Sequence, residues 1–480
     1  MAHGSRRGFL KAASATAAAL AMSKRIPAWA GDGALAGPVK VWATFRDKRY
    51  AQADPLAWKP ATHIAADAIA LNPDATRQEI LGFGGALTDA TCYVLSQLSE
   101  AQREAVMHDL FAPGEMAMNV CRTCIGASDY SRTLYSFDES PEPDPDLKKF
   151  SIDHDKAYIL PVLRDARKLN PELFLFSSPW SPPGWMKPNG SMLGGAMRKL
   201  NFEPYARYFL KFLEGYKAEG VSIDAVTVQN ETDAEQDGHM PACLWAQEQE
   251  IDFVQNHLGP ALRKAGSPTK IWILDHNYSL WGRAIDELSV PEASEYIDGI
   301  AWHGYVGEPS AMTRVHDAFP QKSAYWTEGG PDIALPDYQT DYTKWAETFN
   351  AVVRNWARSI TSWNLALDEK GKPNIGPFSC GGVITVDNAT RKVTRSGQYW
   401  AFAHYCKHVR RGARVFQTDG VGEGKGTANP VSHTGFRNPD GSFVVVLANR
   451  GPETRVQLLL GSNTLEADLP ADSVHTLQWS

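Results

Sequence analysis

The sequence predicts a (β/α)8 TIM barrel with an attached β-sandwich. Between residues 79 and 368, short apolar runs alternate with longer segments of helical periodicity, which is typical of β/α units around a parallel sheet. There are eight such runs, the number that closes a barrel. After about residue 392, strand-like runs separated by turn signals replace this alternation. The chain has 480 residues, 43% hydrophobic and 21% charged, which is enough for one large and one smaller globular domain.

The barrel elements can be placed in order along residues 77–390. The predicted strands are residues 80–87, 117–126, 173–179, 223–229, 270–275, 297–305, 323–328 and 359–367. Apolar residues at three- and four-residue spacing predict helices at 98–111, 156–168, 204–219, 244–262 and 342–356. An open doubly wound sheet is the competing fold. We discount it because no glycine-rich dinucleotide fingerprint follows the first strand.

The smaller domain is predicted from residues 391–480, where the turn signal at 438–441 precedes an apolar run. Residues 39–45 and 63–71 also look like strands, and we expect the segment 31–76 to join the sandwich. That would make the domain discontinuous in sequence. Its strands show no exposed aromatic row, so we expect it to support the barrel rather than bind glycans.

Residues 1–30 are typical of a twin-arginine export signal. Arg6 and Arg7 precede an apolar run over residues 12–22, and Ala28-Trp29-Ala30 ends the segment with small residues. A disordered basic tail is the competing interpretation. We expect a mature protein that is periplasmic or secreted and not inserted in a membrane, because no run reaches about 18 apolar residues.

Several function classes are disfavoured by composition and motifs. A net charge of -7 gives no reason to expect nucleic acid. The 13 histidines form no His-Glu-x-x-His motif, and no Gly-x-Ser-x-Gly elbow follows a strand. We therefore expect no metal and no cofactor. Cys121 and Cys124 should point to opposite sides of a strand, as buried small hydrophobes rather than a zinc or redox pair.

Catalytic groups of such barrels lie at the carboxyl ends of the strands, and polar and aromatic residues gather there in this sequence. Glu231 follows the fourth predicted strand and Glu328 ends the seventh, so the two should face each other across the barrel mouth. Side chains reaching inward could bring their carboxyls to the about 5 Å that double displacement needs. His303 and Tyr305, on the neighbouring strand, are available as donors to Glu328. We predict Glu231 as acid/base and Glu328 as nucleophile.

Structural interpretations of these residues stay open. A lone Asn230-Glu231 pair is as often a cap or ion-pair partner as a catalyst, but a second glutamate three strands later favours function. Trp180 and Trp363 could pack the barrel rim or stack on sugar faces. Arg122 and Asp129 could form a structural ion pair. These two residues are also candidates for the substrate site.

Four motifs together resemble a known family. They are Gly-Phe-Gly-Gly-Ala-Leu-Thr-Asp at 82–89, Ser-Pro-Trp-Ser-Pro-Pro-Gly-Trp-Met-Lys at 178–187, Thr-Val-Gln-Asn-Glu at 227–231 and Trp-Asn-Leu-Ala-Leu at 363–367. They are similar to glycoside hydrolase family 30, of the glucosylceramidase type. The resemblance runs from about residue 77 to the carboxyl terminus.

The resemblance implies a barrel with a β-sandwich, net retention at the anomeric carbon and no metal. In this family's pattern, Glu231 matches the acid/base, Asn230 the neighbour that contacts the sugar 2-hydroxyl, and Glu328 the nucleophile. The remaining matches lie beside the nucleophile or frame the glucose subsite: His303, Tyr305, Arg122, Asp129, Trp180 and Trp363.

Two departures limit what the resemblance implies about substrate. Thr232 stands where the family usually has proline, and Gly304 where the lipid hydrolases carry a bulky aromatic. We expect an exo-acting enzyme that hydrolyses β-glucosides, as oligosaccharides or glycolipids. An endo-β-1,6-glucanase or a β-xylosidase of the same family stays open. A non-catalytic carbohydrate-binding protein is the alternative of another class, and the intact glutamate pair argues against it.

Overall fold

A computed structural model describes residues 37–419 and 431–480 of the chain. The expected export signal at residues 1–30 lies outside these residues. Among the described residues, no helix is both long and apolar enough to cross a membrane.

Eight parallel strands form the barrel, and each overlaps a run predicted from the sequence. They are β5 (Gly82–Gly85), β6 (Val120–Cys124), β7 (Phe174–Ser178), β8 (Ala225–Thr227), β9 (Lys270–Asn277), β10 (Ile297–His303), β11 (Ser323–Glu328) and β12 (Ala357–Ser362). Their hydrogen-bonded order is β5-β12-β11-β10-β9-β8-β7-β6. A backbone bridge between Ala86 and Arg122 links the two end strands, so the predicted barrel is confirmed.

The packing inside the barrel explains the glycine at position 84 and the large side chains of the strands. A Cβ at Gly84 would lie 2.0 Å from the carbonyl oxygen of Val120, so glycine lets β5 approach β6 where the barrel closes. Large side chains fill the interior, with the rings of Trp272 and Tyr325 stacked 3.9 Å apart. The polar residues of the site lie above this apolar layer, at the carboxyl ends of the strands.

Cys121 and Cys124 are buried in different apolar clusters, as predicted.

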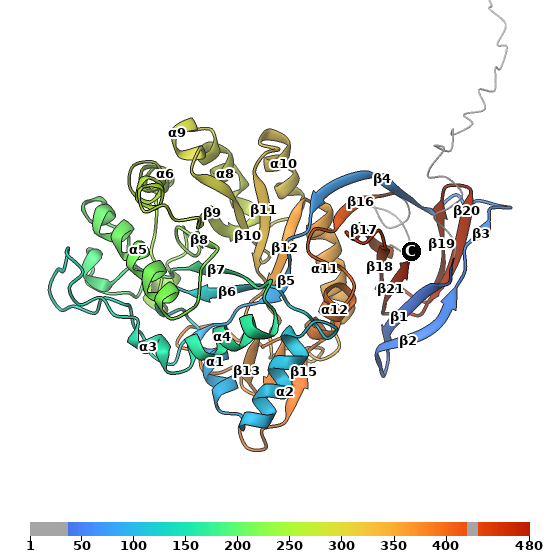
Figure 1. Cartoon of the computed structure of the whole chain (residues 1–480), viewed down its shortest axis with the longest axis horizontal. Helices are drawn as coiled ribbons and strands as arrows, with labels where there is room; N and C mark the ends of the chain where they lie inside the picture. Colours follow the sequence, from blue (N-terminus) through green and yellow to red (C-terminus); the bar gives the residue numbers. More distant parts are fainter. Residues whose placement is uncertain (1–36, 420–430) are drawn as a thin grey trace, which may run out of the picture.

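Helices surround the barrel (Figure 1). They are α1 (Asp89–Ser96), α2 (Glu100–Phe111), α3 (Asp153–Lys156), α4 (Ile159–Leu169), α5 (Phe202–Ala218), α6 (Gln247–Phe253), α7 (Gly259–Lys264), α8 (Trp281–Leu288), α9 (Pro291–Ser294), α10 (Ser310–Ala318), α11 (Tyr342–Arg354) and α12 (Gly397–Cys406). A π-helical turn, Val254–Leu258, divides the single helix predicted at 244–262 into α6 and α7. Single turns of 3-10 helix lie at Gly184–Met186, Lys199–Asn201, Gln236–Gly238 and Tyr278–Leu280.

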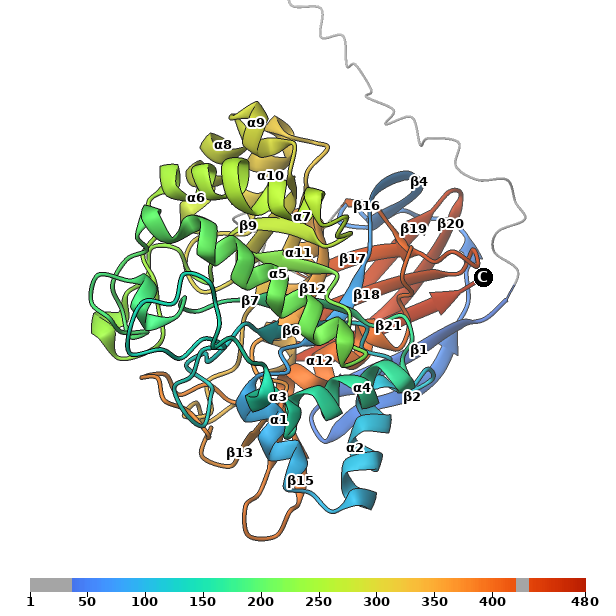
Figure 2. The same cartoon turned by 60° about the vertical axis from the view of Figure 1, so that its left-hand side comes forward.

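A second sheet contains strands from both ends of the chain (Figure 2). Its members are β1 (Val39–Phe45), β2 (Lys48–Leu56), β3 (Lys59–Pro60), β4 (Ile69–Glu79), β16 (Arg414–Asp419), β17 (Val431–Arg437), β18 (Phe443–Asn449), β19 (Thr454–Leu460), β20 (Asn463–Leu469) and β21 (Ser473–Trp479). β1 pairs with β21, and β4 pairs with β16 and β19. The strands ahead of the barrel therefore lie in the same sheet as the carboxyl-terminal ones.

Helices α11 and α12 join the two parts, because both contact barrel strands and sandwich strands. The sequence pattern missed α12, which lies near the start of the segment predicted as β-sandwich. Nine of its ten residues are buried, so it lacks the polar face that reveals a helix in a sequence. A small third sheet, β13 (Ala366–Asp368), β14 (Ile384–Val386) and β15 (Val393–Arg395), follows the last barrel strand.

Candidate active site

The carboxyl ends of the barrel strands surround a cavity of about 330 Å³, within the usual range of small-molecule sites. Seven of the nine predicted site residues line it: Asp129, Trp180, Asn230, Glu231, Tyr305, Glu328 and Trp363. The other two, Arg122 and His303, are fully buried and contact the lining glutamates. The structure therefore brings all nine together.

Glu231 lies just after β8, at a sharp turn in the backbone. Its φ is +52°, a left-handed conformation that costs energy for a residue other than glycine. The turn is fixed on both sides, since Glu231 N donates to Asp275 O at 3.0 Å and Asn230 N donates to Pro179 O at 2.8 Å. Strain of this kind is commonly found where a side chain must be aimed at a ligand.

Glu328, the last residue of β11, accepts a hydrogen bond on each carboxylate oxygen. Arg122 Nη1 donates to Oε2 at 2.6 Å, and Tyr305 Oη donates to Oε1 at 3.0 Å. Burial raises the pKa of Glu328, while the positive charges of His303 and Arg122 oppose that rise. The two donors favour the ionised form that a nucleophile needs.

Arg122 stands at the centre of a buried polar network. Its Nη2 donates to Asp275 Oδ2 at 2.6 Å and to Asn230 Oδ1 at 2.8 Å, so the Asn230 amide is oriented with its Nδ2 available to a ligand. Within the described residues, Arg122 forms its ion pairs with Asp275 and Glu328 and none with Asp129. A buried guanidinium shared between two carboxylates fixes the position of each.

Asp275 is the main site residue that the sequence analysis missed. Thr227 Oγ1 and Thr327 Oγ1 donate to its carboxylate at 2.7 and 2.9 Å. Although burial acts to raise the pKa of Asp275, Arg122 and His303 hold it well below its usual range. It is therefore the fixed negative charge of the site. The sequence did contain a signal for Asp275, because this residue ends the fifth predicted strand.

His303 connects the two halves of the site, and its partners differ from those expected. Its Nδ1 is 3.2 Å from Glu231 Oε1 and its Nε2 is 3.0 Å from Asp275 Oδ1, whereas Glu328 Oε2 is 3.8 Å away. Of the two expected donors to Glu328, Tyr305 therefore forms the hydrogen bond, whereas His303 forms only a longer ion pair. Burial acts to lower the pKa of His303, but the charge of Glu328 and the bonds to Asp275 and Glu231 raise it to about 9.

This shift predicts that the free energy of unfolding falls as pH rises from about 6.5 to 9. The folded state favours protonated His303, so its contribution is complete below the unfolded pKa of about 6.5 and is lost as pH passes the folded value of about 9. The loss should be on the order of 3 kcal/mol. Urea denaturation at several pH values measures it. The free energy of unfolding of His303→Gln should fall less over this pH range than that of the wild type. An equal dependence of the unfolding free energy on pH in the two proteins would contradict the pKa shift of His303.

Asp129 is a buried acid directed at the cavity, and its Oδ1 has no hydrogen-bond partner among the described residues. Burial, with the nearby charges of Glu328 and Glu231, raises the pKa of Asp129 well above its usual range. A buried carboxyl oxygen without a partner is costly unless a polar ligand binds it. Asp129 is therefore suited to bind a hydroxyl group in the cavity.

Trp180 and Trp363 form an aromatic wall of the cavity. Their ring centroids are 5.0 Å apart and their planes differ by 21°. The Arg122 guanidinium lies 4.7 Å from the Trp180 centroid and 5.5 Å from that of Trp363. Because the rings pack on each other and on Arg122, their orientation is fixed, as a stacking surface for an apolar sugar face requires.

Comparison with protein families places both parts of the chain in one family. Residues 80–409 match the family described as "Glycosyl hydrolase family 30 TIM-barrel domain". Residues 420–477 match the "Glycosyl hydrolase family 30 beta sandwich domain".

Individual relatives carry two kinds of name. The "Endo-1,6-beta-D-glucanase" of Neurospora crassa is 34% identical, over 79% of this chain and 80% of its own. The "Lysosomal acid glucosylceramidase" of Mus musculus is 29% identical, over 86% and 83%. Among solved structures, "The endo-beta1,6-glucanase BT3312" superimposes with a TM-score of 0.83 at 28% identity, covering 92% of this chain and 99% of its own.

Proposed function

The chain belongs to glycosyl hydrolase family 30 and is a glycoside hydrolase, and from this premise we propose that it is a retaining endo-β-1,6-glucanase. The sequence-based preference for a glucosylceramidase-type enzyme gives way to its alternative. The relative with the highest identity among those above and the similar solved structure are both named as β-1,6-glucanases, whereas the glucosylceramidase is less similar. A non-catalytic carbohydrate-binding protein is set aside.

The mouth of the cavity has residues that could bind further sugar units on the leaving-group side of the cleaved bond. Tyr305, Val306 and Phe378 line the cavity and are 45%, 55% and 43% exposed. Gly304 lies between the last residue of β10 and Tyr305. A Cβ at this position would lie 2.5 Å from the Trp326 ring, so the close packing requires glycine and no side chain of residue 304 covers the rim. An exposed aromatic rim outside a buried sugar site is a surface on which further sugar units can stack. This rim is the observation on which we base the choice of a polymeric glucan.

We propose a double displacement in which the two glutamates have different roles. Glu328 attacks the anomeric carbon and forms a glucosyl ester, while Glu231 gives a proton to the departing glycosidic oxygen. Water then attacks the ester, and Glu231 takes a proton from that water, so the product keeps the β configuration. In this mechanism the Asn230 amide, whose Oδ1 accepts from Arg122, donates to the sugar 2-hydroxyl, and Asp129 binds another ring hydroxyl.

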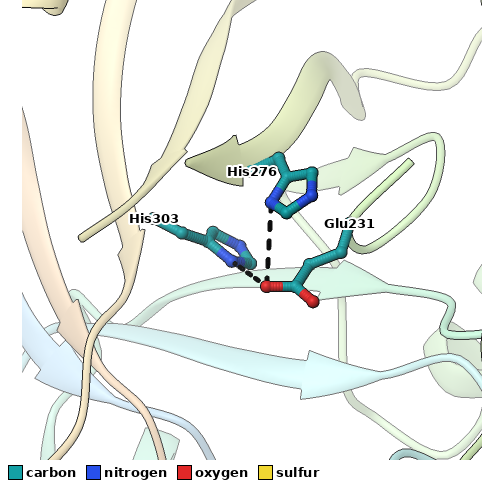
Figure 3. Close-up of side chains that lie close together, drawn as sticks. All are labelled: Glu231, His276 and His303. Carbon is teal, nitrogen blue, oxygen red and sulfur yellow. Dashed lines mark hydrogen bonds and ion pairs between the residues drawn. The ribbon is translucent and has the colours of Figure 1, made fainter. Parts of the chain in front are cut away.

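His303 gives Glu231 a source for its proton. Although burial acts to raise the pKa of Glu231, the hydrogen bond and charge of His303 lower it. The proton of the resting His303–Glu231 pair therefore lies on the imidazole, with Nδ1 at 3.2 Å from Glu231 Oε1 (Figure 3). Transfer from Nδ1 to Oε1 produces the acid form of Glu231 beside the substrate, and Asp275 holds the other side of the ring throughout.

A substrate panel tests this function. The purified enzyme is incubated with β-1,6-glucan, glucosylceramide, an aryl β-glucoside and an aryl β-xyloside, and products are identified by size and anomeric form. We expect β-1,6-linked oligosaccharides of several lengths from the glucan early in the reaction, with the β-anomer formed first. Release of glucose alone would contradict endo action, and faster turnover of glucosylceramide than of glucan would contradict the choice of substrate.

A further inference from the structure

His276 has no part in the double displacement, yet it faces the same carboxylate as His303. It lies near the end of β9, next to Asp275, and is 6% exposed. Its Nδ1 has no hydrogen-bond partner among the described residues and lies 3.7 Å from Glu231 Oε1. Figure 3 shows both imidazole rings directed at this one oxygen from neighbouring strands. An unpartnered buried nitrogen aimed at a carboxylate requires an explanation.

We propose that Glu231, His276 and His303 form a binding site for a divalent transition-metal ion such as Zn²⁺, which inhibits the enzyme. The ion is an inhibitor and not a cofactor, because it occupies the carboxylate that must exchange protons with the substrate. The site itself depends only on the three side chains. The inhibition also rests on the proposed role of Glu231 as acid/base.

The distances suit a zinc ion. One possible ligand atom from each of Glu231, His276 and His303 lies within 4.8 Å of the other two. Zinc holds nitrogen and oxygen ligands at about 2.0–2.1 Å in tetrahedral geometry, which places neighbouring ligand atoms about 3.3 Å apart. The 3.2 and 3.7 Å that separate Glu231 Oε1 from the two nitrogens are already close to that spacing. Two imidazoles and one carboxylate also favour zinc-like metals over Mg²⁺ or Ca²⁺, which prefer oxygen ligands.

Each imidazole is held by a carboxylate on its other nitrogen. His303 Nε2 is bonded to Asp275, and His276 Nε2 is bonded to Asp233. This is the arrangement that orients histidine ligands in zinc sites, because a carboxylate that accepts from one ring nitrogen leaves the other as the metal-binding lone pair. On metal binding, His303 Nδ1 releases its proton to solvent while Nε2–H stays with Asp275.

The fourth position of a tetrahedral ion would face the cavity. Glu231 and His276 both line it, so an ion can enter from solvent and complete its coordination with water. Glu328 and Asp129 line the same cavity, and their carboxyl groups add oxygen atoms to its wall. An ion held there occupies the place of the glycosidic oxygen, so metal and substrate should exclude each other.

Calorimetry with ZnCl₂ and full-length enzyme carrying no histidine tag tests the site. We expect one zinc ion per wild-type chain. His276→Gln keeps a donor for Asp233 but removes Nδ1, and should weaken zinc binding by about tenfold or more. The matched control is His108→Gln, which removes an exposed histidine from α2 and should bind zinc like the wild type. Equal zinc affinity of His276→Gln and wild type, or no stoichiometric binding, would overturn the proposal.

Activity measurements separate the site from the proposed function. Zinc should inhibit hydrolysis of an aryl β-glucoside competitively, and a chelator should restore the rate. His276→Gln, compared with its own rate without metal, should need about tenfold more zinc for the same inhibition. If zinc binds the wild type and His276→Gln binds it more weakly, but saturating zinc leaves hydrolysis unchanged, the site stands and the role of Glu231 as acid/base is overturned.

Discussion

Replacement of Glu328 by glutamine is expected to reduce β-glucan hydrolysis by about 10⁴-fold or more. The amide has nearly the same shape, and its oxygen can still accept a hydrogen bond from Arg122 or Tyr305. It cannot supply the electron pair that forms the glucosyl ester, so the first bond-forming step is lost. Initial rates on β-1,6-glucan and on an aryl β-glucoside measure the effect.

The matched control for Glu328→Gln is Glu347→Gln, on helix α11. Glu347 pairs with Arg450 at 3.5 Å at the surface between barrel and sandwich, and does not line the cavity. Its loss should leave the rate within about twofold of wild type, since Glu347 is not part of the cavity wall and a partly exposed ion pair contributes little to the fold. In the wild type, a 2-fluoro-glucoside that traps the ester should label the peptide containing Glu328. A label on another residue, or more than about a tenth of wild-type activity in Glu328→Gln, would show that the nucleophile is a different group.

The barrel was predictable because its strands are buried on both faces. Such strands appear in a sequence as continuous apolar runs, and all eight lie within the runs identified or within two residues of them. The helix α12 was not predictable in this way, because burial of nearly its whole surface removes the polar face. The strands ahead of the barrel were recognised individually, since alternation is local information. Their pairing with the last strands depends on contacts more than 300 residues apart.

The site was predicted as a set of residues but not as a network. Glu231 and Glu328 were found because catalytic groups of such barrels lie at the carboxyl ends of the strands, and this rule requires only the position of each strand. The partners of His303 depend instead on irregular register. Ala301 pairs with Leu274 and Trp302 with His276, so Asp275 bulges out between them with φ of +44°. Simple alternation cannot place a side chain next to a bulge. Asp275 ends a predicted strand, so its position could be found in the sequence, but its contact with His303 and the direction of the His276 side chain could not.

Replacement of Glu231 by glutamine should reduce hydrolysis of β-1,6-glucan by about 10²–10⁴-fold, the usual range for a lost general acid. A sugar leaving group needs a proton, and glutamine has none to give. A dinitrophenyl leaving group needs no proton, so formation of the ester should lose less than about tenfold on a dinitrophenyl β-glucoside. Burst kinetics measure that step directly.

The second half-reaction distinguishes a missing acid/base from a damaged site. Without Glu231 no group takes the proton from the attacking water, so the glucosyl ester at Glu328 should accumulate. Azide is a nucleophile that needs no base. The matching variant Glu231→Ala removes the negative charge together with most of the side chain, so its site has room for an anion. Added azide should therefore restore turnover of the dinitrophenyl glucoside and yield the β-glucosyl azide. An α-azide, or equal losses on both substrates with no response to azide, would mean that Glu231 positions the substrate and that another group moves the proton.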